Sequence, residues 1–174
     1  IFHSISAFNN AGFSLFSDSL VQYAENTWPM AVVSALIIIG GIGYQVIMEA
    51  FMWAKARLTG KKEHTVFSLH FKIVTSTTLV LLVLGTVAFL FIEFDNPNTL
   101  AGKSLWVKTL LAGFQSVVMR TAGFNSIDIG AMETSALFVA IALMFVGASP
   151  GSTGGGIKTT TIRILLMSTM AALQ

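Results

Sequence analysis

Two runs without a single charged residue constrain this chain most. Residues 29–48 (PMAVVSALIIIGGIGYQVIM) and 73–92 (IVTSTTLVLLVLGTVAFLFI) each reach the ~20 apolar residues that a helix needs to cross a bilayer. Trp28 and Trp53 flank the first run, as aromatic anchors do at a membrane interface. A third uncharged region contains a Gly-rich interruption. We expect long membrane helices near 28–54, 69–94 and 132–172, the third of them broken.

The composition also indicates an all-α membrane protein. Of the 174 residues, 54% are hydrophobic and only 10% are charged, whereas soluble domains carry about 25% charged residues. The chain has no cysteine, which excludes disulfides and Cys-based metal sites within it, and its three histidines are scattered. A formal net charge of +2 gives no reason to expect a nucleic-acid partner. The apolar surface of such helices is expected to contact membrane lipid.

The connectors predict the orientation of the helices. The segment 54–72 carries five basic residues against one acidic residue, whereas 93–104 is mixed in sign and rich in turn formers. Because positive charge marks the cytoplasmic side, 55–68 is predicted to be a cytoplasmic connector and 93–104 an external one. Lys158 and Arg163 then fall toward the cytoplasmic end of the third helix. All three helices agree with this multi-pass arrangement.

One segment is too short to cross the membrane and return. Residues 105–120 (LWVKTLLAGFQSVVMR) have an amphipathic helical pattern, and TAGFNSID (121–128) follows. The chain is outside at Ser104 and must be outside again near Glu133, because the third long helix runs inward. The segment therefore has to enter and leave on the same face, as a half-helix followed by extended backbone. Such backbone is tolerated at membrane depth only where protein or water surrounds it.

The beginning of the chain repeats this design. FHSISAFNNAGFSLFSD (2–18) also precedes a long helix, and NAGF at 10–13 matches TAGF at 121–124 with an offset of 111 residues. GGIG at 40–43 falls near the place where the second copy has its Gly-rich segment. The repeated unit is a helix, a half-helix, an AGF loop and a helix. The first copy, 1–54, lacks its leading helix, and the second copy, 69–174, is complete.

The two AGF loops predict a cation site. A half-helix that ends in mid-membrane directs its partially negative C-terminus inward, and backbone carbonyls can then replace the water shell of an ion. Gly12 and Gly123 supply backbone angles that a β-carbon resists, and Phe13 and Phe124 are expected to pack behind the strands. The alternative for either copy alone is an ordinary glycine turn. The predicted backbone ligands are Asn10, Ala11, Gly12, Phe13, Thr121, Ala122, Gly123, Phe124 and Asn125.

The Gly-rich stretch GASPGSTGGGIKTTT (147–161) raises the possibility of a nucleotide site. In the P-loop pattern GxxxxGK[ST], Gly151 and Gly156 have the right separation, but Lys158 comes one position late and no buried strand precedes it. A flexible linker is also a poor explanation, because linkers do not usually interrupt strongly apolar segments. We keep the phosphate-binding alternative as a minor hypothesis.

Several charged residues near these segments have two explanations each. Arg120 stands directly before the second AGF loop and either braces it through carbonyls or a carboxylate, or extends outward to water. Asp18, Asp128 and Glu133 either concentrate cations at the outer mouth or are ordinary solvated loop charges. Glu49 is expected at the inner interface.

In combination, these motifs resemble the Trk/Ktr/HKT superfamily of potassium transporters. SAFNNAGFSLFSDSL (6–20) resembles its second pore segment, RTAGFNSIDI (120–129) resembles its third, and the Gly-rich stretch resembles the intramembrane loop of its third repeat. The bacterial Ktr-type membrane subunit is the most similar type. The resemblance implies four repeats around one pore, of which this chain carries the second half of repeat two and all of repeat three.

The resemblance further implies function and partners. The expected activity is potassium transport across the bacterial inner membrane, with the preference over sodium left open. No cofactor is expected on this chain, and the full subunit is expected to form a homodimer on a cytosolic nucleotide-binding regulatory ring. Lys158 would then hold the loop, repel ions or simply mark the inner boundary. The implied gate loop comprises Gly147, Ala148, Ser149, Pro150, Gly151, Ser152, Thr153, Gly154, Gly155 and Gly156, followed by Lys158.

Two other classes of protein remain for comparison. A structural membrane scaffold would explain the long helices but not the repeated re-entrant loops. A membrane enzyme or nucleotide-binding protein would need a paired base and nucleophile or an acidic metal cluster, and the sequence offers neither. The chain is therefore expected to be a transporter segment and not an enzyme.

Overall fold

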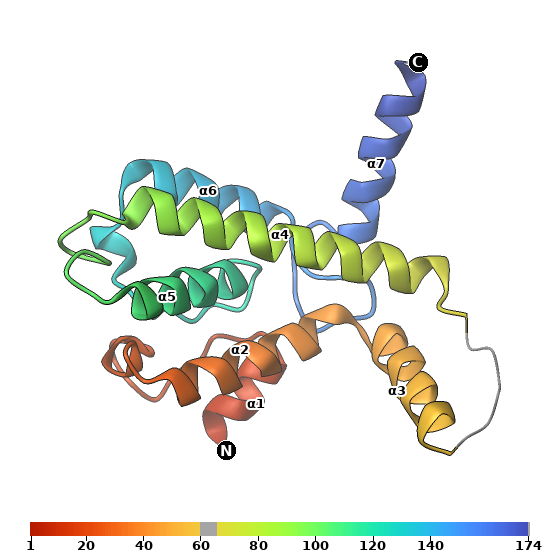
Figure 1. The fold of residues 1–174 in the computed structure, drawn as a ribbon, viewed down its shortest axis with the longest axis horizontal. Helices are drawn as coiled ribbons and strands as arrows, with labels where there is room; N and C mark the ends of the chain where they lie inside the picture. The colour runs from red at the N-terminus through yellow and green to blue at the C-terminus, as the bar shows by residue number, and fades with distance from the viewer. Residues whose placement is uncertain (60–65, 174) are drawn as a thin grey trace.

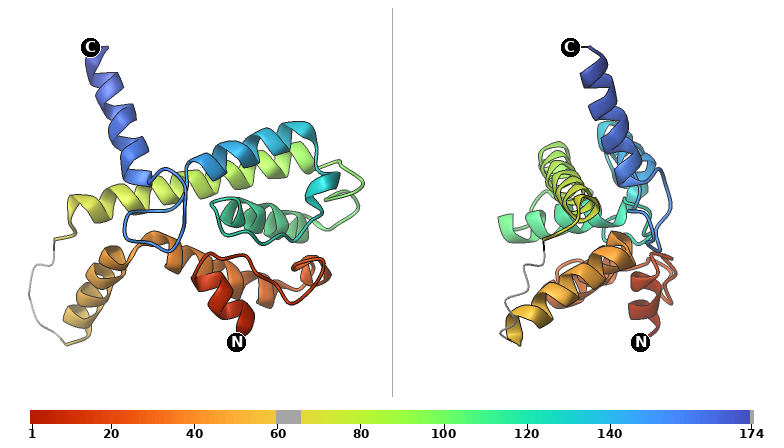
Figure 2. Two further views of the ribbon diagram at one scale, coloured as in Figure 1. Left: turned by 180° about the vertical axis from the view of Figure 1, so that it is seen from behind. Right: turned by 90° about the vertical axis from the view of Figure 1, so that its right-hand side faces the viewer.

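The computed structural model describes residues 1–59 and 66–173, which form helices and the loops between them. Helices α4 and α6 lie side by side, α5 runs along them, α2 packs on the other side of α5, and α1 packs against α2 (Figure 1). Helices α3 and α7 leave this bundle at one end in opposite directions (Figure 2). The basic residues Lys61 and Lys62 of the predicted connector lie outside the described residues.

The first copy of the repeat contains α1 (Phe2–Phe8), η1 (Val21–Tyr23), α2 (Thr27–Ile42) and α3 (Tyr44–Leu58). The prediction of one long helix over 28–54 is wrong, because α2 and α3 meet at an angle of 104°. Gly43 separates them with φ +94°, a conformation that a residue with a β-carbon resists. The break falls in the GGIG sequence, at the position equivalent to Gly154 of the Gly-rich stretch.

The second copy contains α4 (Leu69–Glu93), α5 (Leu105–Val118), η2 (Ile129–Ala131), α6 (Thr134–Phe145) and α7 (Thr159–Ala172). Serine side chains cap two of these helices: Ser68 accepts a hydrogen bond from the Phe71 amide, and Ser104 accepts one from the Val107 amide. The third apolar region is divided into α6 and α7, since the Gly-rich segment between them is not helical.

By length and hydropathy, α4 is the one described helix that can cross a membrane alone, with a mean hydropathy of 2.3. The bent pair of α2 and α3 makes a second candidate. Helix α6 has 12 residues and is therefore only about 18 Å long, so it cannot cross the ~30 Å hydrocarbon layer by itself.

Helix α5 separates two apolar cores. On one side, Leu111 packs in a cluster with Phe89 of α4 and Ala136 of α6. On the other side, Phe114 packs in a cluster with Met30 of α2 and the second AGF loop. Helix α5 is therefore covered on one side by the other helices of its own copy and on the other side by those of the first copy.

A buried carboxylate that no sequence pattern indicated fixes the loop end of this bundle. Glu93 at the end of α4 is fully buried. Its carboxylate accepts hydrogen bonds from the Asn96 amide group (2.7 Å), the Thr99 hydroxyl (2.6 Å) and the Glu133 backbone N–H (2.8 Å). These bonds offset the cost of burying the charge, and they tie the turn after α4 to the start of α6.

Candidate functional site

The two AGF loops have the same backbone conformation. Asn10 and Thr121 have φ values of 52° and 71°, and Gly12 and Gly123 have values of 72° and 79°. In each loop, therefore, two left-handed residues flank an alanine. Since the loops share only the sequence AGF and are 111 residues apart, this agreement supports one structural role for both.

The two loops lie against each other at their glycines. A β-carbon on Gly12 would lie 2.6 Å from the Gly123 Cα and 2.7 Å from the Ala122 carbonyl oxygen. A β-carbon on Gly123 would lie 3.0 Å from the Gly12 Cα. Both positions therefore require glycine for space as well as for backbone conformation.

The loops present carbonyl oxygens that the fold does not use. Within the described residues, the carbonyls of Asn10, Ala11, Gly12, Thr121, Ala122, Gly123 and Phe124 accept no hydrogen bond. Two of the predicted ligands differ: the Phe13 carbonyl accepts from the Ser6 hydroxyl (2.8 Å), and the Asn125 carbonyl accepts from the Leu20 N–H (3.1 Å). The unengaged carbonyls therefore belong to residues 10–12 of the first loop and to residues 121–124 of the second.

The surroundings of the two loops are different. Ala122 is fully buried and Phe124 is 2% exposed, within the cluster formed by α1, α2 and α5. Phe13, in contrast, is 70% exposed. The expectation that both phenylalanines pack behind their loops is correct for Phe124 and wrong for Phe13 in this chain. Among the described residues, Phe13 has no cover comparable to that of Phe124.

The Gly-rich segment forms a closed loop between α6 and α7. At its neck, the Gly147 N–H donates to the Ile157 carbonyl (3.1 Å), and the Ala148 N–H donates to the Gly155 carbonyl (2.9 Å). The Lys158 ammonium donates to the Gly154 carbonyl (2.8 Å). Of the explanations for Lys158, the structure therefore favours a role in holding this loop.

The tip of the Gly-rich loop fits into the break between α2 and α3. The Ser149 and Thr153 N–H groups donate to the carbonyls of Gly41 (3.0 Å) and Gly40 (3.1 Å). The Tyr44 N–H, at the start of α3, donates to the Gly151 carbonyl (3.1 Å). The two broken helices thus supply each other's missing backbone partners, as buried polar backbone requires.

The same loop is bonded to both AGF loops through equivalent side chains. The Asn10 amide group donates to the Thr153 hydroxyl (2.8 Å), which in turn donates to the Phe8 carbonyl (3.0 Å). The Thr121 hydroxyl accepts from the Gly155 N–H (3.0 Å). Sequence patterns identified these residues only as backbone ligands, although a polar side chain at the start of both AGF loops was a visible signal.

Arg120 is buried and does not extend to water. It is 7% exposed, and its Nη2 donates to the Gly147 carbonyl (3.1 Å). Of its two explanations, bracing through a carbonyl is the correct one, but the carbonyl belongs to the Gly-rich loop. The Arg120 Nε is buried as well and has no hydrogen-bond partner among the described residues.

The geometry disfavours a phosphate cradle in the Gly-rich loop. A P-loop leaves successive N–H groups free to surround phosphate oxygens. Here the N–H groups of Ser149, Ser152, Thr153 and Gly155 already donate to protein acceptors.

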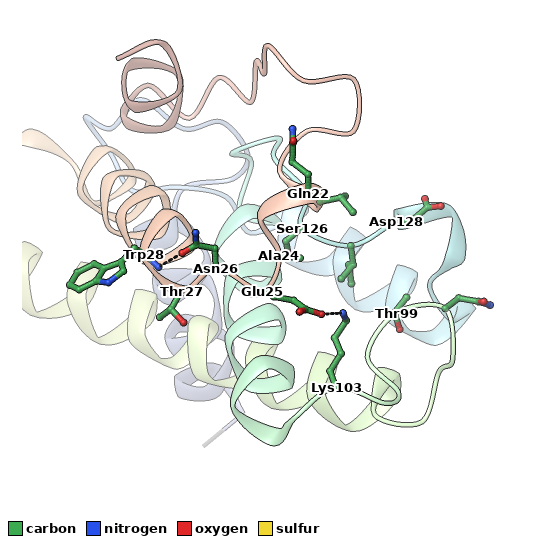
Figure 3. A pocket seen from close by; sticks show the side chains of 13 residues that line it. Gln22, Ala24, Glu25, Asn26, Thr27, Trp28, Thr99, Lys103, Ser126 and Asp128 are labelled. Carbon is green, nitrogen blue, oxygen red and sulfur yellow. Dashed lines mark hydrogen bonds and ion pairs between the residues drawn. The ribbon is translucent and has the colours of Figure 1, made fainter.

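A cavity of about 860 Å³ lies beside residues 126–128, which directly follow the second AGF loop (Figure 3). An ion pair between the Lys103 ammonium and the Glu25 carboxylate (2.7 Å) lies along its wall. Asp128 also lines this cavity, and its carboxylate accepts a hydrogen bond from the Gly130 N–H (2.9 Å). Asp18 and Glu133 are exposed and do not line it.

Comparison with known proteins identifies relatives along the full chain. Residues 1–174 match the family described as TrkH, cation transport protein. The Ktr system potassium uptake protein B of Vibrio alginolyticus is 42% identical over 174 residues, which are 100% of this chain and 37% of that protein. The potassium/sodium uptake protein NtpJ of Enterococcus hirae is 40% identical over 167 residues, which are 96% of this chain and 35% of that protein. The chain thus spans little more than a third of the relatives that it matches.

A solved structure agrees with this fold. The potassium transporter TrkH from Vibrio parahaemolyticus superimposes with a TM-score of 0.72 over 98% of this chain and 34% of that chain. The two are 22% identical in sequence over this match, so the likeness concerns the fold alone.

Proposed function

Because this chain belongs to the TrkH family of cation transport proteins, we propose that it forms two of the walls of a potassium pathway in a longer membrane subunit. The carbonyls of the two AGF loops replace the water shell of the ion as it passes. The chain would supply one and a half repeats of this subunit, and further repeats would complete the ring of carbonyls.

The observation that carries this proposal is the set of unengaged carbonyls. Two loops with matching left-handed residues lie against each other, and within the described residues seven of their carbonyls accept no hydrogen bond. Ala11 and Gly123 are exposed, whereas the other five residues are buried or half-buried, and buried carbonyls without partners are rare in folded proteins. A dehydrated monovalent cation is the ligand that such a set of neutral oxygens suits.

The Gly-rich loop (residues 147–158) is proposed to be the gate of this pathway. It is fastened to both AGF loops and to the break between α2 and α3. Movement of the loop would expose the carbonyls to the side from which α3 and α7 extend. Its glycines allow close packing in the closed position, since a β-carbon on Gly156 would lie 2.7 Å from the Gly147 Cα.

The whole subunit is proposed to work as a homodimer in a bacterial inner membrane, on a cytosolic nucleotide-binding regulatory ring. The name of the Ktr system proteins indicates a multi-component system for those relatives. The relative NtpJ is named for both potassium and sodium, and the transported ion here is proposed to be potassium, with sodium as its competitor.

A structural scaffold is the alternative function. It would account for the apolar helices, but it gives no reason for two matching loops whose carbonyls are unengaged. We therefore favour transport.

The test is potassium uptake by the full-length subunit in cells that lack other uptake systems. Gly123→Ser is expected to reduce the preference for potassium over sodium by about tenfold or more, because the left-handed backbone strains any other residue. Deletion of 151–156 is expected to leave uptake unregulated. Gly102→Ser is the matched control, since Gly102 has φ +75° and a β-carbon there would meet no heavy atom within 4 Å.

Unchanged uptake and ion preference in a folded, membrane-inserted Gly123→Ser protein would contradict the pathway and favour the scaffold. An equal effect of Gly102→Ser would show that general damage, and not the loop, explains the loss.

A further inference from the structure

We propose that Asn10 and Thr121 are positioning residues that latch the Gly-rich loop shut, one from each AGF loop. This inference rests on the proposed function and adds to it, because it assigns to two side chains a task that their backbone carbonyls do not perform. Each residue would thus serve the pathway twice, through its carbonyl and through its side chain.

The first argument is the backbone conformation. Asn10 and Thr121 both adopt left-handed φ values, which glycine adopts without strain. For a β-branched residue such as Thr121, this conformation is a genuine outlier. Strained residues of this kind persist where the side chain has a function that the surrounding structure enforces. Glycine would relieve the strain at both positions, yet the chain carries a polar side chain at each.

The second argument is the direction of the two side chains. Both reach the same loop: Asn10 donates to the Thr153 side chain, and Thr121 accepts from the Gly155 backbone. Asn10 is 9% exposed, so its amide group is held among protein atoms. A small cavity that Asn10 lines together with Arg120 and Ala148 leaves little room for an alternative position of the amide.

The third argument is the placement of the contacts along the loop. Arg120 holds the loop at its beginning, Asn10 holds its tip, and Thr121 holds its end. Because Asn10 and Thr121 come from different copies of the repeat, the loop is fastened on two sides of the pathway. Opening requires both bonds to break, and it therefore depends on the conformation of both AGF loops.

The closing experiment replaces each latch by glycine in the full-length subunit without its regulatory partner. Asn10→Gly and Thr121→Gly accept the left-handed backbone and remove the side-chain bonds to the loop. Asn10→Gly also removes a long bond from the amide group to the Ile37 carbonyl (3.4 Å). Each is expected to raise unregulated potassium uptake by about fivefold, the factor that corresponds to one lost hydrogen bond. The double variant is expected to exceed either single variant.

Three matched variants separate latching from general damage. Thr121→Ser keeps the hydroxyl and is expected to retain low uptake. Asn9→Ala removes a neighbouring exposed amide, which bonds only to the Ile5 carbonyl, and is expected to leave uptake unchanged. Combining Asn10→Gly with Thr153→Ala is expected to raise uptake by less than the two single effects together, because both remove the bond between these side chains, although Thr153→Ala also removes the bond to the Phe8 carbonyl.

A second measurement reports the loop itself. A cysteine is placed at position 152 of a background without other reactive thiols, and its labelling by a membrane-impermeant thiol reagent is timed. Faster labelling in Asn10→Gly and Thr121→Gly supports the latch. Unchanged labelling and uptake overturn it, and if Gly123→Ser still alters ion preference, the pathway stands without the latch. If Gly123→Ser also has no effect, the proposed function fails with it.

Discussion

The first AGF loop (residues 10–13) and the second (residues 121–125) have nearly the same backbone in very different surroundings. Their left-handed residues agree within about 20°, yet Phe13 is largely exposed and Phe124 is buried. The first loop follows a short helix, α1, whereas the second follows α5, which is packed on both sides. The conformation of the loop therefore does not depend on the wall behind it.

This difference separates what the local sequence decides, the backbone turn of each loop, from what tertiary packing decides, the support behind it. A glycine in a short polar context sets the turn of each loop, because only glycine accepts that conformation without strain. The packing of Phe124 sets how firmly the second loop is held. We expect the first loop to gain comparable support only from parts of the subunit other than the residues described here.

The largest expected difference between the two loops is in the stability lost when the phenylalanine of each loop is replaced by alanine. Phe124→Ala is expected to lower the free energy of unfolding by about 3 kcal/mol or more, since it leaves a cavity in the core beside α5. Phe13→Ala is expected to change it by less than about 0.5 kcal/mol in a protein of these residues, because the side chain is exposed. Thermal unfolding of the detergent-solubilised proteins measures both. Equal effects would mean that the two loops are equally supported.

The next effect compares the two glycines. Gly12→Ala and Gly123→Ala both place a β-carbon in a left-handed conformation, which costs about 1–2 kcal/mol. Gly12→Ala should be the more damaging, since its β-carbon would meet the opposite loop at 2.6 Å and that of Gly123 would do so at 3.0 Å. Potassium uptake by each variant gives the order. A reversed order would show that the second loop, and not the first, has the tighter approach.

The smallest effect concerns the exposed ion pair that joins the two copies. The hydrogen bond and the charge of Lys103 hold the pKa of Glu25 below its ordinary value of 4.5. The folded state thus favours the charged carboxylate, so the stabilisation is present above the unfolded pKa and is lost as the pH falls below about 4.5 through the folded pKa. Glu25→Gln should remove this part of the pH dependence. Melting temperatures at about pH 6 and about pH 3 for both proteins test it, and identical pH profiles would contradict a stabilising pair.

The sequence by itself determined that this is a helical membrane protein and where its two AGF loops lie. The uncharged runs predicted helices in a membrane, and the repeated AGF motif identified both loops, because glycine and apolar composition act locally. Membership of the Trk/Ktr type was visible from the same motifs, and the family match agrees with it. The ion site and the gate loop stay predictions for the experiments above.

Only the tertiary structure decided how these parts meet. The bend at Gly43 accommodates the tip of the Gly-rich loop, a partner more than a hundred residues away in the chain. The bond from the Glu133 N–H to Glu93, the bond from Arg120 to Gly147 and the side-chain bonds of Asn10 and Thr121 are likewise contacts between distant segments. A local pattern can predict which conformation a residue adopts, but the partner that satisfies a buried polar group is fixed by packing.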